Sequence, residues 1–256
     1  MGETVLRVTG VSKRFGGLQA LSDVGIQIER GQVYGLIGPN GAGKTTFFNV
    51  LTGLYAPDSG SFELAGKPYQ PHAVHEVAIA GIARTFQNIR LFADMTALEN
   101  VMVGRHCRTR SGVWGAMLRT PAFRAEEAAI ARRSHELLEY VGIGRYADFK
   151  ARTLSYGDQR RLEIARALAT DPQLIALDEP AAGMNATEKV QLRGLIDQIR
   201  KDNRTILLIE HDVKLVMGLC DRVTVLDYGK QIAEGAPAEV QKNEQVITAY
   251  LGKGPQ

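Results

Sequence analysis

The chain has 256 residues, of which 45% are hydrophobic and 23% charged, and its formal net charge is +3. This length and composition predict one substantial hydrophobic core, and so mild a positive charge gives no reason to expect a nucleic-acid partner. No run approaches the roughly 18 apolar residues of a membrane-spanning helix, and residues 1–4 lack the pattern of a signal peptide. Cys107 and Cys220 have neither metal nor redox spacing, which fits a reducing cytosol.

The beginning of the chain predicts a small sheet, a buried strand and a helix. Residues 5–28 alternate in short strand-like runs, with Gly16 and Gly17 as a turn between them. The apolar run 33–37 predicts a buried strand, and the amphipathic run 47–54 predicts a helix. The segment that joins them is therefore a loop between a strand and a helix.

That joining loop has the composition of a phosphate-binding loop. Glycines let main-chain N–H groups turn inward around a polyphosphate, and the following helix start adds its positive dipole end. Lys44 supplies a charge for the β- and γ-phosphates, and the Thr45 hydroxyl can join the shell of a Mg²⁺ ion. A purely structural turn would not require Lys and Thr directly after Gly43. The predicted nucleotide-binding residues are Gly38, Pro39, Asn40, Gly41, Ala42, Gly43, Lys44, Thr45 and Thr46.

The middle of the chain, from Gln87 to Leu154, changes to a mostly helical pattern. Residues 124–140 are rich in Ala, Glu, Arg and Leu and predict a long helix. Residues 112–121, which include Trp114, form an apolar segment interrupted by turn residues. This segment is either an exposed docking element for a membrane partner or an insertion packed on its own subdomain, and the sequence favours neither.

Two acidic residues follow a predicted buried strand in the second half of the chain. The apolar run 174–177 leads into Asp178 and Glu179, and ligands of open α/β sheets bind at the carboxyl ends of the strands. Asp178 is placed to hold Mg²⁺ through its water shell, and Glu179 to polarise the water that attacks the γ-phosphate. A capped helix start at 185–188 and further strands at 205–209 and 222–226 predict a mainly parallel sheet.

The chain resembles the ABC-transporter ATPase family over nearly its whole length, because five motifs occur in the family's order. Besides the phosphate-binding loop and the acidic strand end, residues 154–159 (Leu-Ser-Tyr-Gly-Asp-Gln) before a predicted helix at 160–169 resemble the family signature. Gln87 resembles the Q-loop glutamine, and His211 the switch histidine. Residues 180–185 resemble the D-loop.

The resemblance implies further roles in nucleotide binding and hydrolysis. Gln87 would join Thr45 and Asp178 around the metal, and His211 would hydrogen-bond the γ-phosphate and the attacking water. Phe15 stands where the family places an aromatic ring against adenine, although it is also a candidate core residue of the first sheet. The predicted catalytic residues are Lys44, Glu179 and His211.

The signature implies a site shared between two subunits. In the family it contacts the γ-phosphate held by the partner, chiefly through the positions that are Ser155 and Gly157 here. Tyr156 and Asp158 depart from the usual glycine and glutamine, and Asn185 replaces the usual D-loop aspartate. Asp158 either weakens anion binding or caps the helix start, and we favour the capping role.

The fold class expected from these features is α/β, with a P-loop NTPase (RecA-like) core. A mainly parallel sheet is accompanied by an N-terminal antiparallel β subdomain and a helical subdomain that carries the signature. Residues 1–256 are expected to form a single ABC ATPase domain. Its core with the β subdomain takes residues 1–87 and 170–235, its helical subdomain 88–169, and its helical C-terminal tail 236–256.

Within the family, the chain looks most like the ATPase subunits of branched-chain amino-acid importers, in segments 84–92, 181–185 and 249–252. This implies an ATP- and Mg²⁺-dependent peripheral subunit on the cytoplasmic side of the inner membrane. Its partners would be two membrane-spanning permeases, a second identical or homologous ABC ATPase and a periplasmic substrate-binding protein, with no nucleic acid. Urea or amide uptake and lipopolysaccharide export are the alternatives, and a soluble ABC ATPase acting on nucleic acid or the ribosome is more remote.

Overall fold

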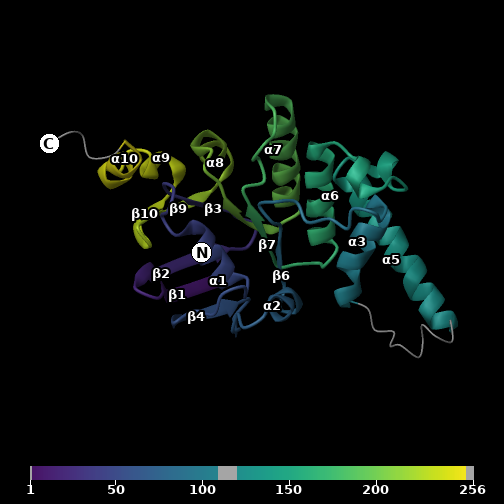
Figure 1. Cartoon of the computed structure of the whole chain (residues 1–256), viewed down its shortest axis with the longest axis horizontal. Helices are drawn as coiled ribbons and strands as arrows, with labels where there is room; N and C mark the ends of the chain where they lie inside the picture. The colour runs from purple at the N-terminus through teal and green to yellow at the C-terminus, as the bar shows by residue number, and fades with distance from the viewer. Residues whose placement is uncertain (1, 109–119, 252–256) are drawn as a thin grey trace. The chain divides into compact units, whose positions relative to one another are not determined.

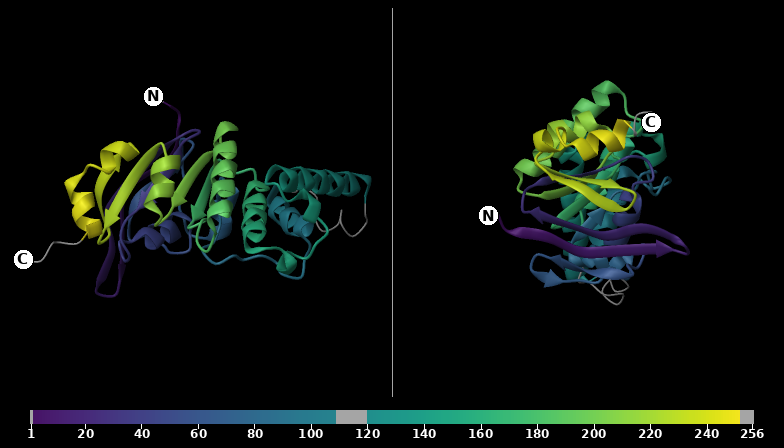
Figure 2. Two further views of the ribbon diagram at one scale, coloured as in Figure 1. Left: turned by 90° about the horizontal axis from the view of Figure 1, so that it is seen from above. Right: turned by 90° about the vertical axis from the view of Figure 1, so that its left-hand side faces the viewer.

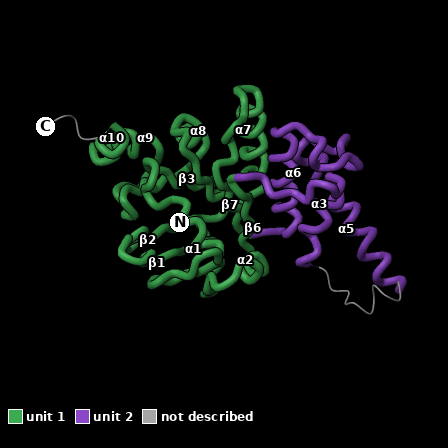
Figure 3. The backbone as a smooth tube through the Cα atoms, in the orientation of Figure 1, with its two compact units in different colours: residues 1–87, 173–256 green, residues 88–172 purple. Residues whose placement is uncertain are grey.

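The structure is a computed structural model that describes residues 2–108 and 120–251. It divides into two compact units (Figure 3), of which the first joins Met1–Gln87 to Gln173–Gln256 and the second is Asn88–Pro172. The division thus falls three residues beyond the expected end of the helical subdomain at 169, and the tail belongs to the first unit. Trp114, in the segment that is either a docking element or a packed insertion, lies outside the described residues.

The first unit contains an antiparallel sheet with the strand order β2-β1-β4-β5. Its strands are β1 (Thr4–Phe15), β2 (Leu18–Glu29), β4 (Ser59–Leu64) and β5 (Lys67–Pro68). The expected short runs are in fact two strands of 12 residues each, and register shifts along their pairing break the alternation that the sequence pattern would otherwise show. This is the predicted N-terminal β subdomain.

The second sheet of the first unit is parallel except at one edge, as expected for a P-loop core. Its order is β10-β9-β3-β8-β7-β6, and only β10 pairs antiparallel to its neighbour. The strands are β3 (Val33–Ile37), β6 (Ile82–Arg84), β7 (Leu174–Asp178), β8 (Thr205–Ile209), β9 (Arg222–Asp227) and β10 (Lys230–Gly235). Every residue of β3, β7 and β8 is buried, which explains why their sequences are continuous apolar runs.

Helices cover both faces of this parallel sheet (Figures 1 and 2). They are α1 (Lys44–Leu51), α2 (Val74–Ala80), α7 (Ala186–Lys201), α8 (Val213–Leu219), α9 (Pro237–Val240) and α10 (Glu244–Leu251). Phe47, Phe48 and Leu51 of α1 belong to one core cluster with buried residues of both sheets, so α1 lies between them. The predicted helix began at residue 47, whereas α1 begins at Lys44 because the end of the phosphate-binding loop forms its first turn.

The second unit is helical. Its elements are α3 (Ala97–Arg105), α5 (Pro121–Tyr140) and α6 (Tyr156–Leu168), with short 3₁₀ turns at His106–Arg108, Gly144–Tyr146 and Ala151–Thr153. Helix α6 begins at Tyr156 and not at residue 160, because Ser155 caps it. Among the described helices of both units, none is long and apolar enough to cross a membrane.

Candidate nucleotide-binding and hydrolysis site

The predicted phosphate-binding loop leaves the carboxyl end of β3 and enters α1. At Gly38 the backbone φ is +153°, and a Cβ there would lie 2.1 Å from the carbonyl oxygen of Leu226. At Gly43 φ is +100°, and a Cβ would lie 2.8 Å from the carbonyl oxygen of Ala20. The loop lies so close to β9 of the parallel sheet and to β2 of the antiparallel sheet that only glycine fits at both positions.

Lys44 opens α1 and is 7% exposed. Its Nζ donates hydrogen bonds to the carbonyl oxygens of Gly38 at 2.6 Å and Pro39 at 2.9 Å. Burial lowers the pKa of Lys44, and the nearby Glu179 carboxylate acts in the opposite direction. The ammonium therefore lies folded over the loop, where an entering phosphate would compete with the two carbonyls for it.

The start of α1 suits an anionic ligand. Its first turn holds no acidic residue, and the N-cap Gly43 provides no side-chain hydrogen bond to the helix. Main-chain N–H groups at such a helix start point toward an anion, and the helix dipole adds to their attraction. With the Lys44 ammonium and the exposed Thr45 hydroxyl, these donors match the oxygens of a polyphosphate.

A pocket of about 300 Å³ lies beside this helix start. Its walls include Phe15 and Leu18 on either side of the first hairpin turn, residues 44–46, and Tyr228. Phe15 is 43% exposed and packs edge-on against Tyr55, with ring centroids 5.2 Å apart. The structure thus places the predicted adenine-stacking ring next to the phosphate donors, and it adds Leu18 and Tyr228, which carry no recognisable motif.

The two acidic residues after β7 have different surroundings. Asp178 is 4% exposed, and its main-chain N–H donates to the Thr85 hydroxyl at 3.3 Å. Glu179 adopts a left-handed backbone with φ +45°, and its N–H donates to the Ile209 carbonyl oxygen at 2.9 Å. This conformation is costly for a residue with a Cβ, so the bond to β8 helps to hold a strained turn at the sheet edge.

Two side chains with predicted catalytic or metal-binding roles, Gln87 and His211, meet at the Glu179 carboxylate. Gln87 Nε2 donates to Glu179 Oε2 at 3.0 Å, and His211 Nδ1 lies 3.6 Å from the same oxygen. Glu179 is 20% exposed at its side chain and His211 is 58% exposed, so solvent reaches the cluster. Gln87 and Glu179, which are 92 positions apart in the sequence, thus lie in contact.

The described residues contain no group of three or more His, Cys, Asp or Glu side chains that could enclose a metal ion. Mg²⁺ in phosphate-transfer sites takes one or two carboxylates and completes its shell with phosphate oxygens and water. Asp178, with the Thr45 hydroxyl and the Gln87 amide, is a donor set of that kind, so the residues present fit Mg²⁺ bound together with a nucleotide.

Glu210, which directly precedes His211, was not predicted from the sequence. Its side chain is fully buried, and it accepts hydrogen bonds from the main-chain N–H groups of Ala181 at 2.8 Å and His211 at 3.2 Å. An acidic residue at the end of an apolar strand and directly before a candidate catalytic histidine is the signal that could have found it.

The signature begins helix α6 in the second unit. Asp158 donates its main-chain N–H to the Ser155 hydroxyl at 3.2 Å, and that hydroxyl donates to the Asp158 carboxylate at 2.8 Å. Arg161 also pairs with Asp158, at 3.2 Å. Ser155 is thus the N-cap residue, and Asp158 supports the cap from the first turn, where its charge is favourable. Tyr156 is 42% exposed, and its hydroxyl accepts a hydrogen bond from Arg160 at 3.3 Å.

The departure at Asn185 has a local explanation. Asn185 caps α7: its side-chain oxygen accepts from the Glu188 N–H at 2.9 Å, and its own N–H donates to the Glu188 carboxylate at 2.9 Å. This reciprocal capping box was predicted from the residues at 185–188. Asparagine is as good an N-cap residue as aspartate, so the helix start keeps its stability without a negative charge.

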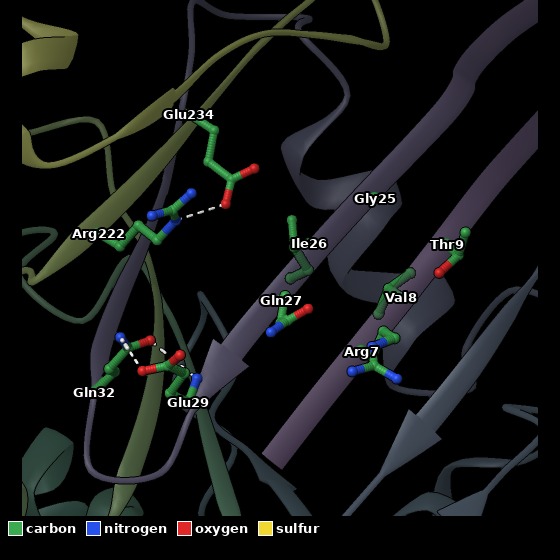
Figure 4. Close-up of a pocket in the computed structure, with 10 residues that line it drawn as sticks. All are labelled: Arg7, Val8, Thr9, Gly25, Ile26, Gln27, Glu29, Gln32, Arg222 and Glu234. Atoms are coloured by element: carbon green, nitrogen blue, oxygen red, sulfur yellow. Dashed lines mark hydrogen bonds and ion pairs between the residues drawn. The ribbon is translucent and has the colours of Figure 1, made fainter. Parts of the chain in front are cut away.

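A second hollow of about 540 Å³ lies at the opposite edge of the sheet (Figure 4). It is bordered by Gln32 before β3 and Arg222 at the start of β9, so it lies at the amino ends of the parallel strands. Its charged side chains have partners within the protein: Arg222 donates to Glu234 at 2.7 Å, Gln32 donates to Glu29 at 3.5 Å, and Arg7 pairs with Glu63, outside the hollow, at 3.5 Å. Since these charges are already satisfied, the hollow does not compete with the loop edge as the site.

The glycine loop, the strained acidic turn and the converging Gln87 and His211 define a P-loop ATPase of the nucleotide-binding cassette class. Residues 21–182 match the ABC transporter family, and residues 230–255 match the family described as branched-chain amino acid ATP-binding cassette transporter. The chain belongs to the ABC transporter family and is an ATPase. This confirms the fold class and the family predicted from the sequence motifs.

Individual relatives narrow this assignment. The high-affinity branched-chain amino acid transport ATP-binding protein BraF of Pseudomonas aeruginosa is 46% identical over 99% of this chain and 100% of the relative. The crystal structure of an ATP-binding cassette of an ABC transporter in its ADP conformation is 32% identical, with a TM-score of 0.84 over 98% of this chain and 99% of that chain. A dimeric cassette in a post-hydrolysis state, bound to ADP and phosphate, is 25% identical, with a TM-score of 0.76 over 91% of this chain and 98% of that chain.

Proposed function

We propose that this chain energises the import of branched-chain amino acids, as a peripheral subunit on the cytoplasmic side of the inner membrane. Its partners would be two membrane-spanning permeases, a second cassette subunit and a periplasmic substrate-binding protein. The full-length similarity to BraF and the match of residues 230–255 support this cargo. The proposal that this chain hydrolyses ATP with these residues rests on one observation: Gln87 and His211 both contact the Glu179 carboxylate.

In the proposed binding step, the phosphates of ATP enter the loop between β3 and α1. Main-chain N–H groups at the start of α1 and the Lys44 ammonium would hold the β- and γ-phosphates, while the Phe15 ring would stack on the base. Asp178, Thr45 and Gln87 would hold Mg²⁺, which supplies charge neutralisation at the phosphate oxygens.

In the proposed chemical step, Glu179 orients and polarises the attacking water. His211, the proposed switch histidine, would hydrogen-bond the γ-phosphate and the attacking water. Gln87 donates to the Glu179 oxygen that the water must approach, so this hydrogen bond has to open as the water enters. The turn at Glu179, with its left-handed backbone, keeps the carboxylate at the sheet edge.

The second cassette subunit completes the proposed site. Ser155 and Gly157 of one subunit would contact the γ-phosphate held by the other, in a dimer of the kind described for the dimeric cassette. The Ser155 hydroxyl donates to Asp158, so it must leave that carboxylate to donate to a phosphate. Because the signature of an isolated chain has no partner phosphate to contact, we expect slow hydrolysis by the chain alone and faster hydrolysis in the assembled transporter.

The test is uptake of radiolabelled leucine into proteoliposomes that contain the permeases and the chain, with the binding protein and ATP supplied. We expect Lys44→Ala to abolish both uptake and ATP hydrolysis, and Lys201→Ala, an exposed lysine of α7, to leave both unchanged. Transport of urea, an amide or lipopolysaccharide in place of leucine would overturn the cargo. Hydrolysis that responds to nucleic acid or ribosomes, with no membrane partner co-purifying, would overturn the transporter role.

A further inference from the structure

Glu210 is a fully buried carboxylate at the edge of the nucleotide site. It directly follows β8, and no part of its side chain contacts solvent. Burial raises the pKa of Glu210, and hydrogen bonds from the main-chain N–H groups of Ala181, Asp212 and His211 act in the opposite direction. A buried acid is expensive unless it is paired or hydrogen-bonded, so these main-chain donors are its compensation.

Glu210 bonds a second loop through one oxygen and its own loop through the other. Oε1 accepts the N–H of Ala181, at 2.8 Å, and Oε2 accepts the N–H of the next residue, His211, at 3.2 Å. Ala181 lies two residues after Glu179, in the segment 179–185 that connects β7 to α7. Glu210 and His211 belong to the segment 210–212 that connects β8 to α8. One carboxylate therefore joins the loop that follows the catalytic glutamate to the loop that carries the switch histidine.

This connection extends the sheet beyond its last strand pair. Glu179 donates its main-chain N–H to Ile209, the final residue of β8, at 2.9 Å. Beyond the ends of both strands, the Glu210 carboxylate accepts the Ala181 N–H and so makes a second link between the two chain segments. His211 Nδ1 also lies 3.9 Å from Glu210 Oε2 and 3.6 Å from Glu179 Oε2, so both acids flank its ring.

Only a side chain with two acceptor oxygens serves both loops at once. Alanine or leucine at this position would leave the buried N–H of Ala181 without this partner, which destabilises the fold. An amide has a single acceptor oxygen, so it can bind one loop while presenting an N–H group to the other. A carboxylate can therefore keep the bond to the second loop and, at the same time, fix the peptide N–H of His211.

We propose that Glu210 is a positioning residue that couples the segment 180–185 to the switch histidine, so that the two loops take up their hydrolytic arrangement together. The proposal rests on the roles proposed above for Glu179 and His211. Segment 180–185 corresponds to the family's D-loop, so the coupling would let a change in that loop reach His211 without passing through the nucleotide.

The test compares Glu210→Gln with the unaltered full-length chain, by steady-state ATP hydrolysis in the assembled transporter and by amide hydrogen exchange of the purified chain. We expect kcat to fall about tenfold while the KM for ATP stays within twofold. We also expect amide exchange to quicken in both 180–185 and 211–213, with exchange in β3 unchanged. Glu210→Asp keeps the charge but withdraws the oxygens by one methylene, so it should show the same pattern and serves if the amide variant folds poorly.

The matched control is Glu234→Gln, which removes a hydrogen-bonded carboxylate at the opposite edge of the sheet. It should change neither kcat nor exchange in the two loops. An unchanged kcat in folded Glu210→Gln, a KM that rises together with the fall in kcat, or faster exchange in only one loop would each overturn the coupling. Normal hydrolysis by Glu179→Gln would instead overturn the proposed chemical step, and the exchange measurement would still decide the coupling.

Discussion

The two edges of the six-stranded sheet are built in opposite ways. At the carboxyl edge, the hydrogen bonds of the Lys44 ammonium within the described part of the chain go to the carbonyl oxygens of Gly38 and Pro39, and not to a carboxylate. At the amino edge, the buried Tyr34 hydroxyl bonds both Thr224, at 2.7 Å, and Glu234, at 2.9 Å. Incompletely neutralised charge lies at the carboxyl edge, where we propose that the nucleotide binds, whereas the Tyr34 network at the amino edge is satisfied within the protein. Substitutions at the first edge should therefore change activity, and those at the second should change stability.

The largest expected effect is on hydrolysis, in the variant Glu179→Gln. Glutamine keeps the size of the side chain and its contact with solvent but cannot act as a base toward water. We expect the hydrolysis rate of the assembled transporter to fall about 10²–10⁴-fold, with ATP affinity retained in a direct binding measurement. A rate within threefold of the unaltered protein would contradict the role of this carboxylate.

A smaller effect is expected for Gly38→Ala, which tests whether β9 constrains the loop. The added Cβ would meet the Leu226 carbonyl oxygen, and overpacking of this kind costs about 1–3 kcal/mol. We expect a lower melting temperature and weakened nucleotide binding. Gly41→Ala is the matched control, because Gly41 also has a positive φ, of +80°, but a Cβ there would meet no atom within 4 Å. Equal losses of stability in the two variants would show that the close approach is unimportant.

The opposite edge should respond only in stability. Glu234→Gln removes the negative charge that accepts from Tyr34 and Arg222, but Tyr34 keeps its bond to Thr224. We expect a loss of about 1 kcal/mol in the free energy of unfolding, measured by chemical denaturation, with kcat unchanged. A fall in kcat without a loss of stability would contradict the contrast between the two edges.

The smallest effect is expected for the ion pair between Asp212 and Lys189, whose charged atoms are 2.8 Å apart. Asp212→Asn should keep the cap of α8, through the bond to the Leu215 N–H, and lose about 0.2–1 kcal/mol at neutral pH. The hydrogen bond from Lys189 holds the pKa of Asp212 below its ordinary value of 3.8 in the folded state. The pair therefore stabilises the fold above that value, and its contribution is lost as the pH falls through the lowered pKa. Denaturation curves of the two proteins should converge in acid, and a difference that persists there would contradict the ion-pair explanation.

The local sequence was sufficient to predict a strand or helix wherever the pattern of residues within one short segment determines its secondary structure. The strands at 33–37 and 205–209 were predicted with their bounds, because complete burial makes every position apolar. The short strand β6 and the half-exposed edge strand β10 were not predicted, because three residues or a polar edge carry no clear period. Helix starts were predicted late at 47 and 160, because residues of a ligand-binding motif also serve as the first turn of a helix.

The sequence by itself determined the class of protein, since glycine, lysine and threonine at fixed spacing, an acidic strand end and a signature each express a local chemical requirement. Tertiary structure alone decided which of these residues meet and what holds them there. The convergence of Gln87 and His211 on Glu179, and the burial of Glu210 between two loops, depend on strand order in a parallel sheet. Strand order brings together segments that are distant in the chain, and no local pattern of residue types records it.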